Sequence, residues 1–521
     1  MITSVDQDLL TTLPKAQRSS FGDWLRDTWF SAAVLFLMTA TVIALFWFPV
    51  KRMSTNVEVS YNEGWNAYRA AMVPSKIPLY GVPPQGFGTG TAYPPISFHL
   101  IGNLGTTNTF VSVGRWVSLI ALITTGVFIA LIVRCGGGSS PVAVFSFLLY
   151  EIGIALLTPD RVGMNDPQLL GEALSAAGLY FYVRNPQSMR SLCASALLLC
   201  LAGFTKHNLI AFPAAIAIDS FLRSRRAFIT WAGAMFLSAG LLTVMTLWID
   251  GRYFPLHLMG GGGKRAYSFA MAWSGYHLYA TLFQSLLVIA TAWIIYKSRS
   301  QRVIALAFVL THVLAFLLAG GFGVGPNIFF NSLAVTVIAS GLALSDMRAA
   351  VEKWRPAGLD WSATLMFALF AVSIMAFVPG QLRRDRAKMR VLASQQEEFN
   401  SAVQFIKTHP GPALCESLLL CYEAGKPFEY EPFSVRDQLK TGVLHEGDIL
   451  HLLQTHHFQT VQIALRSDEG NVKDPELKAS LSSDQTQPDT ERRFTPAFMK
   501  ELLNDYQLSK RTSEMAIFCP Q

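Results

Sequence analysis

The stretch of sequence that decides the fold is residues 30–50, FSAAVLFLMTATVIALFWFPV, which contains no charged residue. About 20 helical residues cross the roughly 30 Å hydrocarbon core of a bilayer, so this stretch predicts a membrane-spanning helix. Comparable apolar blocks recur up to Gly380, and the remaining residues read as ordinary soluble sequence. A helix satisfies its own backbone in lipid, and the short alternating segments of a membrane barrel are not evident. We therefore expect an all-α polytopic membrane bundle, followed by a small C-terminal α/β domain.

The composition excludes an ordinary soluble protein and argues against a nucleic-acid partner. Only 15% of the 521 residues are charged, against roughly 25% in typical globular domains. The net charge is +7, but the basic residues lie between the apolar blocks and do not line one face. That distribution is a topology signal.

The apolar blocks predict about eleven spans, which cover residues 30–50, 111–133, 141–157, 168–183, 191–204, 208–222, 228–249, 277–296, 303–319, 327–345 and 361–380. With a cytoplasmic N-terminus, five short cytoplasmic loops carry twelve Lys and Arg residues, and four short outer loops carry five. This bias predicts a cytoplasmic tail at 1–29, an uncleaved first span and an outer, periplasmic domain at 381–521. The short spans at 191–204 and 208–222 are alternatively a re-entrant pair, which leaves the orientation unchanged.

Two regions outside the spans have recognisable local structure. The long first outer loop, 51–110, contains an expected amphipathic helix at 62–73. In the tail we expect helices at 393–409 and 495–503, strand character at 412–422 and 458–465, and a last strand that ends near Phe518. Cys415 and Cys421 are spaced for a disulfide across a tight turn, with Cys519 as a rival partner.

Three carboxylates on the predicted outer face are candidates for chemistry: Glu63, Asp160 and Asp166. Charged groups at a membrane edge are costly unless they are paired or used. Two acids that converge on a cavity suit general-base catalysis, or a cation that neutralises a leaving phosphate. Each acid also has a structural interpretation. Asp166 before Pro167 suits a helix N-cap, Asp160 could pair with Arg161, and Glu63 suits the first turn of a helix.

Candidate cations lie on the same predicted face. Lys206 lies in the Lys206-His207-Asn208 turn between two short spans, where it suits a phosphate partner. Lys264 and Arg265 follow four glycines and could close over a phosphate group, although a flexible linker explains the glycines equally well. The glycine run does not match a nucleotide-binding P-loop.

Several motifs together resemble the GT-C superfamily of membrane glycosyltransferases. They are Asn62-Glu63-Gly64-Trp65-Asn66-Ala67-Tyr68, Pro78-Leu79-Tyr80, Tyr93-Pro94-Pro95, Gly114-Arg115, Met164-Asn165-Asp166-Pro167 and Lys206-His207-Asn208. The resemblance covers about residues 61–344, with protein O-mannosyltransferases and the lipid A aminoarabinose transferase as more distant relatives. It implies a polyprenyl-phosphate sugar donor, an unidentified glycan, lipid or protein acceptor, and inverting transfer at the outer face of the bacterial inner membrane.

The resemblance also implies roles for individual residues. The first-loop acid of the family matches Glu63, the expected base, whereas Asn62 stands where many relatives have Asp. Asp166, and less closely Asp160, matches the acidic motif of the second outer loop, which in relatives flanks the donor phosphate, in some with a divalent metal such as Mg or Mn. Lys206, Lys264 and Arg265 would bind the phosphate. The expected sugar or acceptor contacts are made by Asn62, Trp65, Tyr80, Tyr93 and His207.

The sequence leaves other functions open. An interfacial aromatic belt explains Trp65, Tyr80 and Tyr93 as well as sugar stacking does. A transporter or flippase for a lipid-linked glycan would show inverted repeats or broken helices at mid-membrane, and no clear repeat is evident. A degenerate enzyme that serves as an envelope scaffold is the third possibility, because Asn62 departs from the family pattern.

Overall fold

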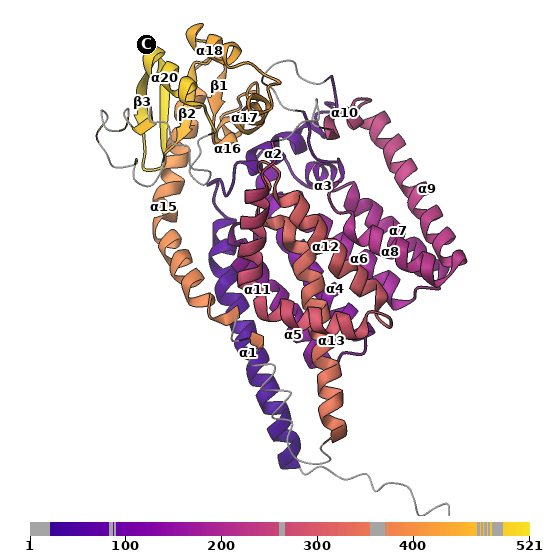
Figure 1. Ribbon diagram of the computed structural model, residues 1–521. Helices are drawn as coiled ribbons and strands as arrows, with labels where there is room; N and C mark the ends of the chain where they lie inside the picture. The colour runs from indigo at the N-terminus through magenta and orange to yellow at the C-terminus, as the bar shows by residue number, and fades with distance from the viewer. Residues whose placement is uncertain are drawn as a thin grey trace, which may run out of the picture.

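The computed structural model describes residues 21–82, 87, 90–259, 266–354, 370–371, 374–465, 469, 473, 477, 480–481 and 493–521. The membrane part of this chain is helical (Figure 1). Its elements are α1 (Phe21–Arg52), α2 (Asn62–Met72), α3 (Ile96–Leu104), α4 (Phe110–Cys135), α5 (Ser140–Leu157), η1 (Pro159–Arg161), α6 (Pro167–Arg184), α7 (Met189–Gly203), α8 (Ala211–Arg223), α9 (Arg225–Ile249), α10 (Phe254–Leu258), α11 (Phe269–Lys297), α12 (Arg302–Ala319), η2 (Pro326–Phe329) and α13 (Phe330–Trp354).

The predicted spans fall on helices of the bundle. The first ten correspond to α1, α4 to α9 and α11 to α13, and most of the eleventh, at 361–380, lies outside the described residues. Within the described part, seven helices are long and apolar enough to cross a membrane, so the structure does not confirm a count of eleven. α8 has 13 residues, about 20 Å of helix, which is shorter than a bilayer core.

Burial separates the central helices from the peripheral ones. In the span Pro326–Ala350, which includes most of α13, 89% of the most apolar stretch is buried inside the protein, against 6% of the corresponding stretch of α9. α9 exposes large apolar side chains such as Phe236, Leu237 and Trp248. An apolar face without a protein partner suits contact with lipid. Around the centre, α4 packs against α5 and α6, and α7 packs against both α6 and α9.

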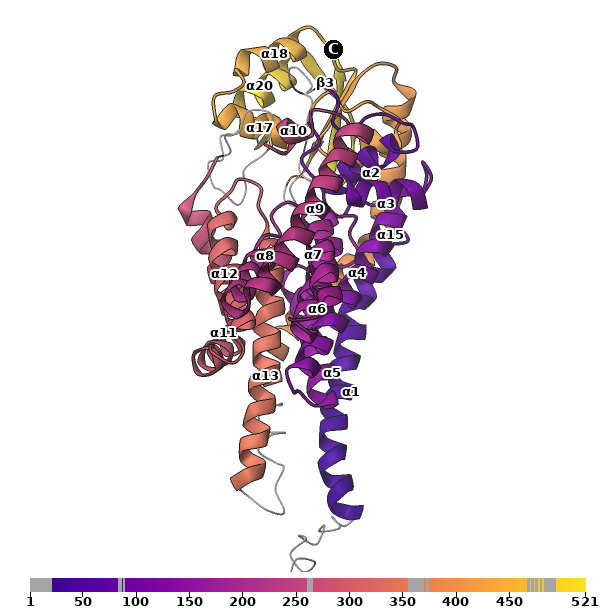
Figure 2. The same ribbon diagram turned by 90° about the vertical axis from the view of Figure 1, so that its right-hand side faces the viewer.

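The C-terminal part forms a small α/β domain at one end of the bundle, next to α2, α3 and α10 (Figures 1 and 2). Its sheet has the order β1-β2-β4-β3, with β1 and β2 parallel and the other two pairs antiparallel. The elements are α15 (Val378–Thr408), β1 (Ala413–Cys415), α16 (Leu418–Glu423), α17 (Pro432–Lys440), α18 (Glu446–Gln454), β2 (Thr460–Ala464), α20 (Pro496–Asp505), β3 (Tyr506–Arg511) and β4 (Met515–Pro520).

Most expectations for local structure are confirmed. The helix expected at 62–73 is α2, the helix at 393–409 is the end of α15, and the strand at 458–465 is β2. α20 begins as predicted, because Thr495 caps it and Pro496 stands in its first turn. The strand expected over 412–422 is wrong beyond Cys415, where the chain turns into α16. The strand β3, which pairs with β4, was not predicted from the sequence.

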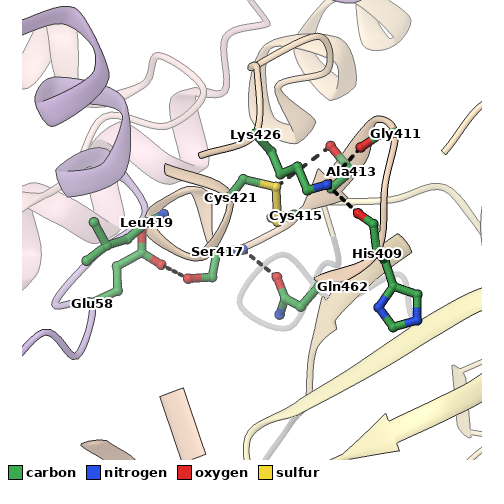
Figure 3. The surroundings of a disulfide bond; sticks show 10 residues. All are labelled: Glu58, His409, Gly411, Ala413, Cys415, Ser417, Leu419, Cys421, Lys426 and Gln462. Atoms are coloured by element: carbon green, nitrogen blue, oxygen red, sulfur yellow. Dashed lines mark hydrogen bonds between the residues drawn. A yellow bond between two sulfur atoms is a disulfide. The ribbon is translucent and has the colours of Figure 1, made fainter. Parts of the chain in front are cut away.

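α16 connects the C-terminal domain to the first loop. The disulfide between Cys415 and Cys421 joins β1 to α16, with a Cα–Cα distance of 5.8 Å (Figure 3), and Cys519 is free. The Glu58 carboxylate accepts hydrogen bonds from the Ser417 hydroxyl and the Leu419 N–H (Figure 3). α16 also packs against α2 at a glycine, Gly64, where a Cβ atom would collide with the α16 backbone.

Candidate active site

Glu63 lies in the first turn of α2 and is fully buried. Arg115 of α4 donates from Nε to Glu63 Oε1 at 2.8 Å and from Nη2 to Oε2 at 2.7 Å. The N–H groups of Val59 and Asn165 donate to the same carboxylate, at 2.8 and 3.0 Å. Both oxygens of Glu63 therefore accept hydrogen bonds. These bonds link the loop before α2, α4 and the loop before α6.

Arg115 is itself 1% exposed and reaches beyond Glu63. Its guanidinium donates to the carbonyl groups of Thr55 at 2.6 Å and Val57 at 2.7 Å. A bidentate arginine–carboxylate pair has a planar, defined geometry, so this pair sets the path of the chain between α1 and α2. Arg115 is recognisable from the sequence only as part of a motif, because nothing local indicates its partner 52 positions away.

Asp166 combines a structural and an electrostatic role. As predicted, it caps α6, because its Oδ1 accepts from the Gln168 N–H at 2.8 Å. Its Oδ2 accepts from Arg161 Nη1 at 2.6 Å, and Lys206 Nζ lies 3.7 Å from Oδ1. Burial alone would raise the pKa of Asp166, but Lys206 and Arg161 outweigh burial and hold the pKa below its usual value. Asp166 is therefore an ionised anchor that orients two cations.

Aromatic side chains extend this cluster toward the first loop. Lys206 Nζ lies 5.0 Å from the centre of the Tyr93 ring, and Trp65 meets Tyr93 edge to face at 5.4 Å. The Tyr80 hydroxyl donates to the Tyr93 carbonyl at 2.8 Å, but Tyr80 is fully buried. Tyr93 and Trp65 therefore border the cluster, and Tyr80 supports Tyr93 from behind. His207, which follows Lys206 in the chain, is exposed.

The structure separates Asp160 from Asp166. The Asp160 carboxylate lies 3.2 Å from Arg52 of α1 and 3.2 Å from Lys388 of α15. Asp160 is therefore directed toward α1 and α15, and the local ion pair expected between Asp160 and Arg161 is replaced by the pair of Arg161 with Asp166. Two further predicted residues, Lys264 and Arg265, lie outside the described residues.

No protein-family model and no curated protein sequence matches the chain significantly. Solved structures do match. ArnT from Cupriavidus metallidurans in the apo state has a TM-score of 0.53 at 12% identity, with 94% of this chain and 98% of ArnT covered. ArnT bound to undecaprenyl phosphate has a TM-score of 0.51 at 11% identity, with 93% and 97% covered. The Archaeoglobus fulgidus oligosaccharyltransferase, tethered to an acceptor peptide, has a TM-score of 0.52 at 13% identity, with 85% and 70% covered.

These neighbours are GT-C membrane glycosyltransferases, as the sequence motifs suggested. The chain shares the fold of these structures. At such low identity the likeness establishes the fold alone. In this fold, Glu63 lies at the start of α2, Asp166 lies in the loop before α6, and Lys206 lies in the turn between α7 and α8. The three meet at the end of the bundle that carries the C-terminal domain.

The described residues do not fit a divalent metal at this candidate site. Among them, no group of three or more His, Cys, Asp or Glu side chains is placed to hold a metal ion. The acids that would serve as ligands are already paired with cations, Glu63 with Arg115 and Asp166 with Arg161 and Lys206. A divalent metal ion would have to displace these cations before it could bind the carboxylates.

Proposed function

We propose that this protein transfers a sugar from a polyprenyl-phosphate donor to an acceptor, with inversion, at the outer face of the cytoplasmic membrane. The observation that carries the proposal is the cluster of Arg161, Asp166 and Lys206 at the outer-domain end of a GT-C bundle. Two cations held by one buried carboxylate are oriented for a phosphate before it arrives. The ArnT structure that shares the fold holds undecaprenyl phosphate, a lipid with such a head group.

The proposed reaction is a single displacement. The acceptor oxygen attacks the anomeric carbon from the side opposite the phosphate, and the bond between that carbon and the phosphate oxygen breaks. The polyprenyl phosphate leaves with the electron pair, and the acceptor proton passes to water. Negative charge grows on the departing phosphate, so Arg161 and Lys206 stabilise the transition state more than the ground state. Asp166 keeps both side chains in place.

Glu63 enters the proposal as a positioning residue and not as the base that the sequence suggested. Its two oxygens accept from Arg115, Val59 and Asn165, and the side chain is fully buried. A general base needs an oxygen within hydrogen-bond reach of the acceptor hydroxyl. We assign no catalytic role to Asp160, because its carboxylate is directed toward Arg52 and Lys388.

Two observations support the outer location of the site. The disulfide between Cys415 and Cys421 lies in the domain that covers the candidate site, and disulfides persist in oxidising compartments such as the periplasm. The excess of Lys and Arg in the loops at the opposite end favours a cytoplasmic position for that end.

The test uses the full chain in nanodiscs and undecaprenyl phosphates that carry labelled sugars. We expect transfer by the wild type and a loss of about 100-fold or more in kcat/KM for Arg161→Ala and Lys206→Ala. Lys407→Ala, which changes an exposed lysine on α15, serves as the matched control and should keep full activity. Full activity in both Arg161→Ala and Lys206→Ala would refute the assignment.

A second candidate is a protein that binds the lipid-linked sugar without turning it over. The engagement of Glu63 by Arg115, with Asn62 in place of an acid, favours this function. The same experiment separates the two candidates. Saturable binding that depends on Lys206, without release of undecaprenyl phosphate for any acceptor lipid or peptide, would support the binding protein.

A further inference from the structure

The beginning of α15 carries a high concentration of positive charge. Residues 383–390 contain one acid, Asp385, and five basic side chains, which are Arg383, Arg384, Arg386, Lys388 and Arg390. All five basic side chains are exposed, whereas Asp385 is buried. The segment follows the predicted eleventh span on the predicted outer side, where short loops usually carry few cations. The charge bias that orients the bundle therefore does not account for this segment.

Three of these arginines share the face of α15 that points away from the protein. Arg383, Arg386 and Arg390 follow one another at spacings of three and four residues, which places them on one side of a helix. Asp385 and Leu392, on the opposite side of the helix, are buried. Within the described part of the chain, none of the three arginines forms an ion pair or a side-chain hydrogen bond. We call these three residues the arginine stripe.

The other two cations of the segment have partners within the protein. Arg384 Nη2 donates to Gln381 Oε1 at 2.6 Å, and Lys388 Nζ lies 3.2 Å from Asp160 Oδ1. Along α15, the next acid on the face of the stripe is Glu397, two turns beyond Arg390 and about 10 Å further along the helix. The charge of the arginine stripe is therefore left for a partner outside the chain.

The position of α15 beside α1 places the arginine stripe at the level of lipid head groups (Figure 1). The candidate span of α1 ends at Arg52, and Trp47, one turn earlier, is 69% exposed, as is typical of aromatic side chains at a membrane interface. Arg52 and Lys388 both lie 3.2 Å from the Asp160 carboxylate, so Lys388 is level with the end of α1. Arg383 lies roughly 8 Å of helix closer to the bilayer than Lys388, near the level of Trp47.

The chemistry of the stripe suits a phosphodiester that carries a net negative charge. A guanidinium group keeps its charge and donates two parallel hydrogen bonds to a phosphate. The stripe is about 10 Å long, which is comparable with the depth of a head-group layer. Directly before α15, Phe377 exposes an apolar side chain where acyl chains would lie. An apolar side chain below a row of arginines fits a lipid better than a soluble acidic protein.

We propose that the arginine stripe is a docking surface for the head groups of anionic phospholipids. α15 is the helix that leads from the bundle to the C-terminal domain, so a lipid bound at the stripe holds the base of that domain at the membrane surface (Figure 1). The inference goes beyond the proposed function, because it uses none of the residues of the candidate site. It also explains why the segment keeps its basic residues on the side of the membrane that the charge bias disfavours.

The experiment titrates the full chain, in a neutral detergent, with phosphatidylglycerol or with phosphatidylcholine of the same acyl chains, and counts the bound lipids by native mass spectrometry. The test variant is Arg383→Gln/Arg386→Gln/Arg390→Gln. The matched variant Arg383→Lys/Arg386→Lys/Arg390→Lys keeps the charge at the same positions. Lys407→Gln/Lys500→Gln, which changes exposed lysines of the C-terminal domain, controls for overall charge.

We expect the wild type to bind phosphatidylglycerol more tightly than phosphatidylcholine. The glutamine variant should lose the tightest-bound phosphatidylglycerol, with an affinity that falls about 10-fold or more, and should keep its affinity for phosphatidylcholine. The lysine variant and Lys407→Gln/Lys500→Gln should retain most of the preference. Phosphatidylglycerol should also raise the melting temperature of the wild type more than that of the glutamine variant, because a ligand of the folded state stabilises it. A melting temperature equal to that of the wild type without added lipid would show that the glutamine variant is folded.

Three results would overturn the inference. The first is equal affinity of the wild type for the two lipids. The second is an unchanged preference for phosphatidylglycerol in the glutamine variant, and a loss of that preference in Lys206→Ala instead would place the anionic lipid at the candidate phosphate site. The third is displacement of phosphatidylglycerol from the wild type by a soluble polyglutamate peptide at a lower concentration than phosphatidylglycerol itself requires, which would favour an acidic protein as the partner.

Discussion

The buried pair of Glu63 and Arg115 makes a prediction about stability that its geometry allows us to work out. Replacing Arg115 with Met leaves the Glu63 carboxylate, which is 0% exposed, with only the Val59 and Asn165 N–H groups. Breaking a buried ion pair from one side costs about 3–5 kcal/mol, because one charge stays buried without compensation. Glu63→Leu should cost a similar amount, because Arg115 then retains only carbonyl acceptors.

The double variant Glu63→Leu/Arg115→Met buries no charge, so its cost should fall well below the sum of the two single costs. We expect a coupling free energy of at least about 2 kcal/mol in a double-mutant cycle. The assay is unfolding in mixed detergent micelles with increasing SDS, followed by tryptophan fluorescence. Additivity of the two single variants within about 0.5 kcal/mol would refute the description of this pair as the buried link between the first loop and α4.

Three further predictions concern the contact between the C-terminal domain and α2. Reducing or removing the Cys415–Cys421 disulfide, which joins positions six apart, should lower the free energy of unfolding by about 2 kcal/mol, measured by denaturant titration with and without dithiothreitol. Gly64→Val should push α16 away from α2 and lower the melting temperature of the protein. An unchanged melting temperature, with unchanged resistance of α16 to protease, would contradict the close packing of Gly64 against Leu419. Burial raises the pKa of Glu58 from 4.5 to about 7, so the carboxyl binds its proton more tightly in the folded state and stability should fall as the pH rises from about 4.5 to about 7. Thermal melting at several pH values should lose this part of its pH dependence in Glu58→Gln, and an identical pH dependence in that variant would be evidence against the shifted pKa.

Short stretches of sequence predicted the elements whose formation depends on neighbouring residues alone, such as apolar helices and helix starts. The apolar blocks marked ten helices of the bundle, because lipid requires an apolar side chain at nearly every position of a spanning helix. The N-cap Asp166 placed the start of α6, because an N-cap acts within its own turn. Strand character at 412–422 failed beyond Cys415, where packing of α16 against α2 overrides a local preference for strand.

The candidate site shows where local information ends. Composition and position marked Glu63, Asp166 and Lys206 as unusual charges at a membrane edge, and the structure places all three at one end of the bundle. Their roles depend on partners that the sequence does not reveal. Arg115 engages Glu63 from 52 positions away, and Arg161 pairs with Asp166 instead of the adjacent Asp160.

The sequence alone determined that this chain spans a membrane, which segments form ten helices of the bundle and which loops carry the unusual charges. Each of these properties follows from how single segments partition between water and lipid. Only the tertiary structure decided which charges pair and which cations engage Glu63, Asp160 and Asp166. Those outcomes depend on the burial of several distant segments in one place, where low polarity makes each pairing strong and each unpaired group costly.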